Sequence, residues 1–270
     1  MFESYARISY ERKAEYLGRE LTEEDMIRLC RGISPADIKS MFEISQTEAV
    51  TDDRLVKQVD LMRVKIELIS KGKQRLSSRY SREDLDRRVA VHEVGHVILA
   101  KHFGEYLEGV NILGLANSLG VTVQSIEEGS ELRTVRELLE QVCVHYGGVI
   151  NEYLYYGKDM KNVSMGCGHD ISVATNILNY VIYSNSLINT DSLLLNYESI
   201  EGAIQMNYTD IIKETSIKCN KITEEILKAN KEISDKLVEI LVDKKEVSSI
   251  ELERFFKDNE ITTIDIKDKL

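Results

Sequence analysis

Three features that would point to other kinds of protein are missing from this 270-residue sequence. The cysteines form no CxxC pair, so we expect neither a disulfide framework nor a thiolate zinc site, and a reducing, cytoplasmic location is predicted. The cysteines are Cys30, Cys143, Cys167 and Cys219. No stretch approaches the roughly 18 apolar residues of a membrane span, and the first residues lack the basic and apolar regions of a signal peptide. We therefore expect no membrane segment in this chain.

Basic charge and proline are also scarce. The sequence has 35 basic and 46 acidic residues, and its net charge of -11 lacks the electrostatic signature of a nucleic-acid-binding protein. The single proline, Pro35, predicts long uninterrupted helices. A hydrophobic content of 43% is sufficient for a sizeable core, and the length suits one large domain or, in preference, two.

Helix start signals recur along the chain. At four places a hydroxyl side chain precedes a carboxylate by three residues, which is the pattern of a capped helix N-terminus. The pairs are Thr22 with Asp25, Ser34 with Asp37, Ser81 with Asp84, and Thr134 with Glu137. The third helix is expected to end near Gly104 and the fourth to run towards Gly157.

Two other segments have a different character. Residues 109–114 and 119–125 are short, β-branched and bounded by glycine, and they predict a small antiparallel pair of strands. The polar, basic stretch 70–81 is the best candidate for a linker.

The stretch "VAVHEVGHVILA" (89–100) contains the candidate metal-binding and catalytic residues. Residues four apart on a helix share one face, so His92 and His96 can present their imidazoles to one zinc ion. Glu93 can then reach a water molecule on that ion and take its proton during attack on a carbonyl. Gly95 is unfavourable in a helix by about 1 kcal/mol relative to alanine, which indicates that another element packs closely there.

The motif also has a simpler interpretation, because HExxH on a helix can be a surface coincidence. The apolar residues around it favour a buried helix, in which polar groups need partners. A catalytic zinc site requires a third protein ligand, and spacing does not choose among the downstream candidates. These are His102, His145, Glu152, His169 and Asp170, of which the last has helix N-capping as its alternative role.

Several segments, in order along the chain, resemble the FtsH-type AAA proteases. The segment quoted above resembles that family's zinc helix. Other matches are "SLGVTVQS" (118–125) with the substrate-side strand, "LLEQVCVHYGGVINEYLYYG" (138–157) with the following helix, and "VSMGCGHDISVAT" (163–175) with the loop and helix that supply an aspartate as third zinc ligand. In addition, residues 21–50 resemble the small AAA lid domain and residues 230–256 the closing helices of the family.

The resemblance implies that Asp170, ahead of Glu152, is the third zinc ligand. Two departures from the family pattern matter. No GxxxxGK[ST] phosphate loop is present, so this chain alone is not expected to hydrolyse ATP, and the family's N-terminal membrane segment is not found. His169 occupies a position where the family usually has asparagine, and it could compete for the metal.

Together these observations predict a mainly α protein. Residues 1–75 are expected to form a helical AAA lid, and residues 76–270 an α-helical zinc peptidase domain with a small antiparallel β element. The predicted activity is zinc-dependent endopeptidase cleavage of unfolded or loosely folded proteins. The predicted site comprises His92, His96 and Asp170 as zinc ligands, Glu93 as general base, and Leu119, Gly120, Val121 and Thr122 as a strand that holds extended substrate.

The resemblance also implies assembly. We expect a homo-oligomer, hexameric at high concentration, with an AAA ATPase as a further partner. An apolar stripe in residues 222–241 must pack either in the chain's own core or against another copy. Two alternatives to an enzyme are a non-catalytic module that docks on AAA protease rings and a purely structural metal site.

Overall fold

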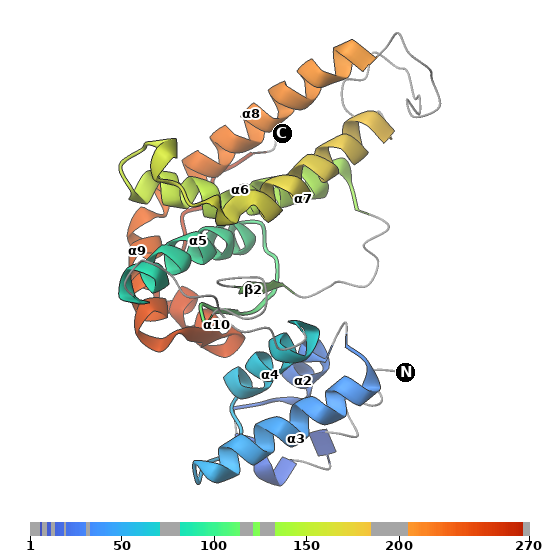
Figure 1. The fold of residues 1–270 in the computed structure, drawn as a ribbon, viewed down its shortest axis with the longest axis vertical. Helices are drawn as coiled ribbons and strands as arrows, with labels where there is room; N and C mark the ends of the chain where they lie inside the picture. The colour runs from blue at the N-terminus through green and yellow to red at the C-terminus, as the bar shows by residue number, and fades with distance from the viewer. Residues whose placement is uncertain are drawn as a thin grey trace. The chain divides into compact units, whose positions relative to one another are not determined.

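The computed structural model describes most of the chain and divides it into two compact units. The described residues are 33–70, 82–113, 121–124, 133–184 and 205–266, together with positions 6, 10–11, 14–18 and 20–30. The first unit combines Met1–Val89, Glu105–Glu128 and Ile240–Asp258, and the second combines Ala90–Gly104, Gly129–Glu239 and Asn259–Leu270. Both are predominantly helical (Figure 1), as predicted.

The N-terminal part of the first unit is a small helical cluster. It consists of a short 3-10 turn η1 (Ala14–Tyr16) and the helices α2 (Glu23–Leu29), α3 (Pro35–Thr51) and α4 (Gln58–Ser70). The predicted caps are present, because Thr22 accepts from the Asp25 amide and Ser34 from the Asp37 amide. The apolar faces of the helices meet in a core in which Met26, Leu29, Ile38, Met41 and Leu61 are almost fully buried.

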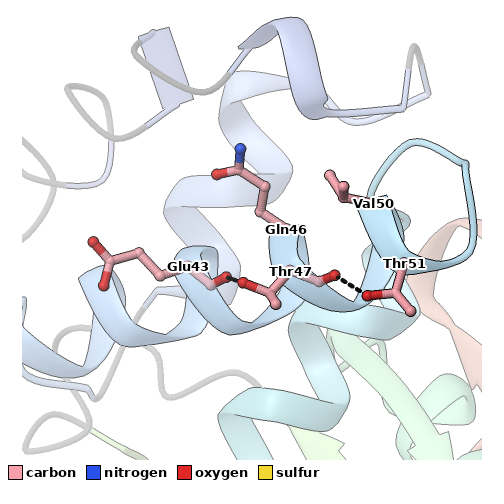
Figure 2. A pocket seen from close by; sticks show the side chains of 5 residues that line it. All are labelled: Glu43, Gln46, Thr47, Val50 and Thr51. Atoms are coloured by element: carbon pink, nitrogen blue, oxygen red, sulfur yellow. Dashed lines mark hydrogen bonds between the residues drawn. The ribbon is translucent and has the colours of Figure 1, made fainter.

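The outer face of α3 carries a shallow hollow (Figure 2). It is lined by Glu43, Gln46, Thr47, Val50 and Thr51. The hydroxyls of Thr47 and Thr51 donate back to the carbonyl oxygens four residues earlier in the helix. Because the lining contains no imidazole or thiol, it offers no set of nitrogen and sulfur ligands for zinc.

A three-stranded antiparallel sheet belongs to the same unit. Strand β1 (Leu107–Asn111) lies between β2 (Val121–Gln124) and β3 (Glu246–Ser248). The predicted pairing of the two sequence-adjacent strands is confirmed, whereas β3 was not predicted. Val121 pairs with Asn111 and Thr122 with Val110, so half of the expected substrate strand lies on an edge strand. Leu119 and Gly120 lie outside the described residues.

Helix α4 contacts this sheet and also helix α10 (Ser249–Asp258), which follows β3 in the chain. Lys65 and Glu108 form an almost fully buried ion pair with an Nζ–Oε2 distance of 2.7 Å. The Gln58 amide donates to the Ser249 hydroxyl at 2.6 Å. The division of the chain into a lid (1–75) and a peptidase domain (76–270) stays a prediction, because the first compact unit unites α4 with strands from beyond residue 76. The predicted linker, after its first residue, lies outside the described residues.

The second unit is a packed set of helices. It contains most of α5 (Arg82–His102), α6 (Val135–Tyr155), the short turns η3 (Met160–Asn162) and η4 (Met165–Cys167), α7 (Gly168–Asn179), the π-helical turn η5 (Tyr180–Ser184), α8 (Gln205–Ala229) and most of α9 (Lys231–Lys244). Helix α6 packs against both α7 and α8 (Figure 1). As predicted, α5 ends before Gly104 (φ +78°) and α6 before Gly157 (φ +92°), both in the left-handed region.

The apolar stripe in residues 222–241 lies mostly in the chain's own core, although Ala229 is exposed and Ile233 is partly exposed. It is interrupted between α8 and α9, and Ile222, Ile226, Leu237 and Leu241 are at most 3% exposed. These side chains are therefore unavailable to another copy, and the stripe gives no support to the predicted self-association. Among the helices that the structure describes, none is both long and apolar enough to span a membrane.

Asp60 accepts hydrogen bonds from several residues around the start of α4. Its carboxylate accepts two hydrogen bonds from the Arg54 guanidinium, at 2.6 and 3.0 Å, and one from the Lys57 amide at 2.8 Å. Burial alone would raise the pKa of Asp60, but these hydrogen bonds outweigh burial and lower the pKa below its ordinary value. The folded state is therefore stabilised by the ionised form of Asp60.

Asp60→Asn is expected to lower the free energy of unfolding by about 1–3 kcal/mol at pH 7, because charged hydrogen bonds to Arg54 are lost. The native pKa is depressed, so the wild-type advantage is present above the unfolded value of about 3.9 and disappears as pH falls through the native pKa. Urea unfolding at pH 7 and pH 3 measures this change. Asp52→Asn is the control, since Asp52 contacts the same arginine but is 59% exposed; equal losses in both variants would contradict the assigned role.

Candidate metal centre

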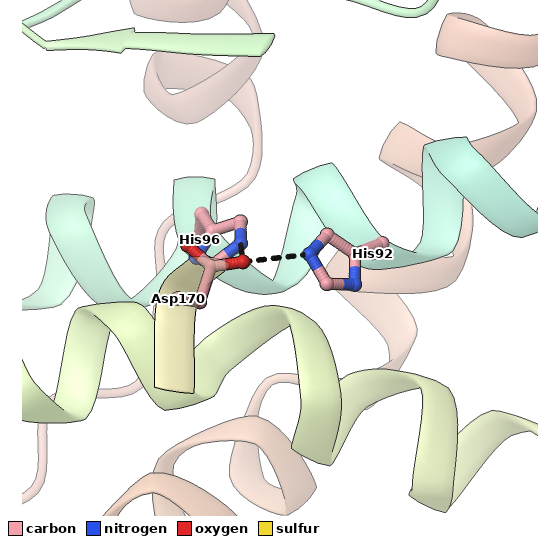
Figure 3. A group of neighbouring side chains, drawn as sticks. All are labelled: His92, His96 and Asp170. Atoms are coloured by element: carbon pink, nitrogen blue, oxygen red, sulfur yellow. Dashed lines mark hydrogen bonds and ion pairs between the residues drawn. The ribbon is translucent and has the colours of Figure 1, made fainter. Parts of the chain in front are cut away.

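Two imidazoles from α5 and one carboxylate from α7 converge in the second unit (Figure 3). The Oδ2 atom of Asp170 lies 3.2 Å from Nε2 of His92 and 3.6 Å from Nε2 of His96. Potential ligand atoms of the three side chains all lie within 4.8 Å of one another. The side chain of His92 is 13% exposed, that of His96 9% and that of Asp170 18%, so the group is largely withdrawn from water but still accessible.

Glycines allow α5 and α6 to approach closely beside this group. A Cβ atom added to Gly95 would lie 2.2 Å from the carbonyl oxygen of Gly147, a distance that no real Cβ contact reaches. A Cβ atom on Gly148 would lie 2.4 Å from Nε2 of His92. The sequence-based expectation that Gly95 marks a close contact is thus confirmed, and the same contact places the α6 backbone directly against the imidazole of His92.

The Nδ1 atom of each imidazole lies within hydrogen-bond distance of an oxygen atom on α6. His92 Nδ1 lies 2.8 Å from Oε1 of Glu152, and His96 Nδ1 lies 2.8 Å from the carbonyl oxygen of Val144. A carboxylate and a carbonyl only accept hydrogen bonds, so both Nδ1 atoms carry protons in the neutral tautomers. The Nε2 lone pairs are then directed towards a cation, which is the usual arrangement behind a metal-binding histidine.

Glu152 is itself fixed. Its side chain is fully buried, and it accepts hydrogen bonds from the amide and the hydroxyl of Ser164 at 2.9 and 2.8 Å. Burial would raise the pKa of Glu152, but hydrogen bonds from His92 and Ser164 lower it. Glu152 is therefore ionised and accepts a hydrogen bond from His92 Nδ1.

Asp170 occupies the first turn of α7 but does not cap it. The N-cap residue of α7 is Cys167, which makes no capping hydrogen bond through its side chain. Instead, the second carboxylate oxygen of Asp170, Oδ1, lies 3.3 Å from Nδ1 of His145. The alternative of a plain helix cap is therefore wrong in this structure, and the aspartate is directed towards histidines on both of its oxygens.

The remaining candidate ligands are placed elsewhere. His102, at the end of α5, stacks edge-on against Phe103. His169 is exposed, and neither it nor His102 belongs to the convergent group of the described residues. Glu93 follows His92 on α5, is 7% exposed, and contributes negative charge close to the His92 ring.

The electrostatics of the site favour positive charge. Burial would lower the pKa of His92, but hydrogen bonds with Asp170 and Glu152 outweigh burial and raise that pKa to about 10. Burial would raise the pKa of Asp170, but hydrogen bonds from three histidines hold it far below its ordinary range. Two imidazole nitrogens and one carboxylate oxygen are a donor set that suits zinc, so the residues present fit a metal ion.

Comparison with known proteins agrees with this donor set. Residues 79–255, about two thirds of the chain, match peptidase family M41. The chain belongs to this family.

Curated relatives of the M41 chain include three proteins from distant organisms. It is 30% identical over 174 residues to "ATP-dependent zinc metalloprotease FtsH 1" of Methylacidiphilum infernorum, covering 61% of this chain and 26% of the relative. It is 28% identical over 259 residues to "ATP-dependent zinc metalloprotease FtsH 2" of Bdellovibrio bacteriovorus, covering 88% and 41%. It is 32% identical over 159 residues to "Mitochondrial inner membrane i-AAA protease supercomplex subunit YME1" of Saccharomyces cerevisiae, covering 57% and 20%. The chain thus spans less than half the length of each of these relatives, and the predicted FtsH-type resemblance is confirmed for the peptidase region.

The sequence pointed to Glu152 only as a candidate ligand, and its contact with His92 Nδ1 and that of the Val144 carbonyl with His96 were not predicted. The Val144 carbonyl, Gly148 and Glu152 are spaced by four residues on α6 and share one face of that helix. Of these, only Gly148 and Glu152 are visible in the sequence, as a glycine four residues before a carboxylate on one helix face, and this pair is a signal that could have been recognised. The Ser164 contact to Glu152 depends on the path of the loop, for which the sequence offers no comparable signal.

Gly148→Ala is expected to displace the His92 ring, because the new methyl group would overlap Nε2. We expect a folded protein whose affinity for added Zn²⁺ falls by at least tenfold, in the range typical of disturbed ligand support. Chelator competition measures the affinity, and circular dichroism checks the fold. Gly168→Ala is the matched control, since a Cβ there meets nothing within 4 Å; unchanged affinity in Gly148→Ala would show that the ring is not held by this contact.

Proposed function

We propose that this M41 chain is a zinc-dependent endopeptidase in which His92, His96 and Asp170 bind the metal. The observation that supports this most is the convergence of both Nε2 atoms on one oxygen of Asp170, with each Nδ1 engaged from behind. The name "zinc metalloprotease" carried by several relatives agrees with the donor set.

Glu93 is the proposed general base. A zinc ion held by His92, His96 and Asp170 would supply Lewis-acid activation of a water molecule and of the scissile carbonyl. The Glu93 carboxylate takes the proton of the attacking water and passes it to the leaving amine, which is the role of a general acid-base residue beside a nucleophile. Its place next to His92 on α5 and its low exposure support this role.

The substrate is proposed to be an extended segment of an unfolded or loosely folded protein. Strand β2 lies at the edge of the three-stranded sheet, and in the described part of the chain it pairs only with β1. An edge strand can pair with a further strand through main-chain hydrogen bonds, and these depend on the backbone of the added segment more than on its side chains. The residues proposed for this contact remain Leu119, Gly120, Val121 and Thr122.

Assembly and energy supply stay predictions. The relatives are named as ATP-dependent, whereas the 270-residue sequence contains no GxxxxGK[ST] motif, so we propose that cleavage of already unfolded substrate by this chain needs no nucleotide. An AAA ATPase partner, hexameric assembly and a cytoplasmic location also remain proposals. All four cysteines are buried and free of disulfides, which agrees with a reducing location.

Asp170→Ala is expected to remove most of the bound zinc, because it deletes a ligand. Glu152→Gln is expected to weaken zinc binding by at most about 10–100-fold, because the glutamine oxygen can still accept a hydrogen bond from His92 Nδ1. Metal analysis after dialysis and chelator competition measure both variants. If Glu152→Gln empties the site while Asp170→Ala leaves it filled, the ligand assignment is wrong.

Glu93→Gln is expected to leave zinc bound and to reduce cleavage of casein by at least 10²-fold, because the amide cannot take the proton of the attacking water. Gel analysis of casein fragments, with parallel metal analysis, measures both properties. A wild-type chain that holds zinc but cleaves no unfolded protein would instead favour the non-catalytic docking module. Full activity in Glu93→Gln would remove the general base from the mechanism.

A further inference from the structure

The His145 side chain contacts the proposed metal centre without belonging to the three-residue donor group. We propose that His145 is a positioning residue, which holds one oxygen of Asp170 so that the other is presented to the metal. This inference rests on the proposed function, because it takes Asp170 as a metal ligand.

The two oxygens of Asp170 have separate partners. Oδ1 lies 3.3 Å from Nδ1 of His145, whereas Oδ2 lies near the Nε2 atoms of both α5 histidines. A carboxylate that binds a metal ion is ionised and only accepts hydrogen bonds. His145 Nδ1 must therefore carry the proton and donate it to Oδ1.

This division of partners has a chemical consequence. A carboxylate with one oxygen engaged by an N–H donor offers a single oxygen to a cation. Catalytic zinc sites combine three protein ligands with one position for water or substrate, and a second carboxylate oxygen on the metal would compete for that position. His145 thus favours binding of Asp170 through Oδ2 alone and helps to keep the fourth position open.

His145 is also well placed to act together with its neighbours on α6. Val144, His145, Gly148 and Glu152 are separated by one, three and four residues, so they lie on the side of α6 that faces the site. The Val144 carbonyl holds His96, Gly148 abuts the His92 ring, Glu152 holds its Nδ1, and His145 holds Asp170. Helix α6 therefore supplies no proposed ligand but orients all three.

The test compares two replacements of similar size that differ in one property. His145→Asn keeps a side-chain N–H donor near the position of Nδ1, whereas His145→Leu has none. His145 is 29% exposed, so we expect both variants to fold. Melting temperatures of the metal-free proteins check this, and if His145→Leu does not fold, His145→Asp takes its place, because a second carboxylate has no N–H donor in its ionised form.

Affinity for Zn²⁺ alone, from chelator competition, is the first readout. We expect His145→Leu to bind Zn²⁺ about 10–100-fold more weakly than wild type, and His145→Asn to recover most of that loss. The visible spectrum of the Co²⁺-loaded protein is the second readout, because it reports coordination number independently of activity. The His145→Leu spectrum is expected to show weaker absorption, as a second Asp170 oxygen reaches the metal, and the His145→Asn spectrum is expected to match wild type.

The possible outcomes separate this inference from the proposed function. Wild-type affinity and spectrum in His145→Leu, alongside zinc loss in Asp170→Ala, would overturn the positioning role and leave the ligand set intact. Zinc loss in His145→Asn as complete as in Asp170→Ala would also overturn it, because His145 would then be a ligand. Zinc retention in Asp170→Ala would instead contradict the proposed ligand set.

Discussion

The close contact between α5 and α6 is the constraint on which the metal centre depends. Gly95 and Gly147 leave no room for a Cβ atom on either helix, so the two backbones touch. At this separation a main-chain carbonyl of α6 can reach His96, and the Glu152 side chain can reach His92. With wider spacing, which any larger residue at Gly95 would impose, the Nδ1 atoms would lose these partners and the rings would rotate freely. A packing contact therefore determines the chemical state of two side chains.

The site concentrates negative charge in a poorly hydrated place. Glu93, Glu152 and Asp170 all lie within or beside the group of imidazoles, and the largest exposed fraction among these carboxylates is 18%. Isolated buried carboxylates are costly, so such a cluster is stable only with compensating positive charge or hydrogen-bond donors. In the metal-free protein the histidines supply this compensation, as the raised pKa of His92 shows. A divalent cation at the centre would supply the compensation itself and would favour the neutral, metal-binding form of His92.

The sequence predicted this centre only in part, and the reasons are physical. His92 and His96 were found because a helix fixes the relation between residues four apart, and the caps at Thr22, Ser34 and Thr134 were found because capping is local. Asp170 could not be selected by spacing, since its proximity to the imidazoles depends on how α7 packs on α6. Resemblance to a family was needed to choose it from five candidates.

Other features of the fold were missed for similar reasons. Strand β3 has three residues, too few for an alternating pattern to be recognised, and it pairs with a strand far earlier in the chain. The apolar stripe in residues 222–241 was recognised, but sequence alone does not distinguish a core face from an exposed one. Only packing of α8 and α9 showed that most of the stripe is buried.

The pairing of β1 with β3 makes completion of the first unit a late event in synthesis. Gln58 and its partner Ser249, which immediately follows β3, are 191 residues apart. A ribosome adding about 5–20 residues per second needs roughly 10–40 s to cover that distance. In the later part of this interval the N-terminal helices and β1 have been synthesised, but the strand that closes one edge of β1 does not yet exist. A nascent chain released before residue 246 keeps that edge open, and open strand edges recruit other chains into aggregates.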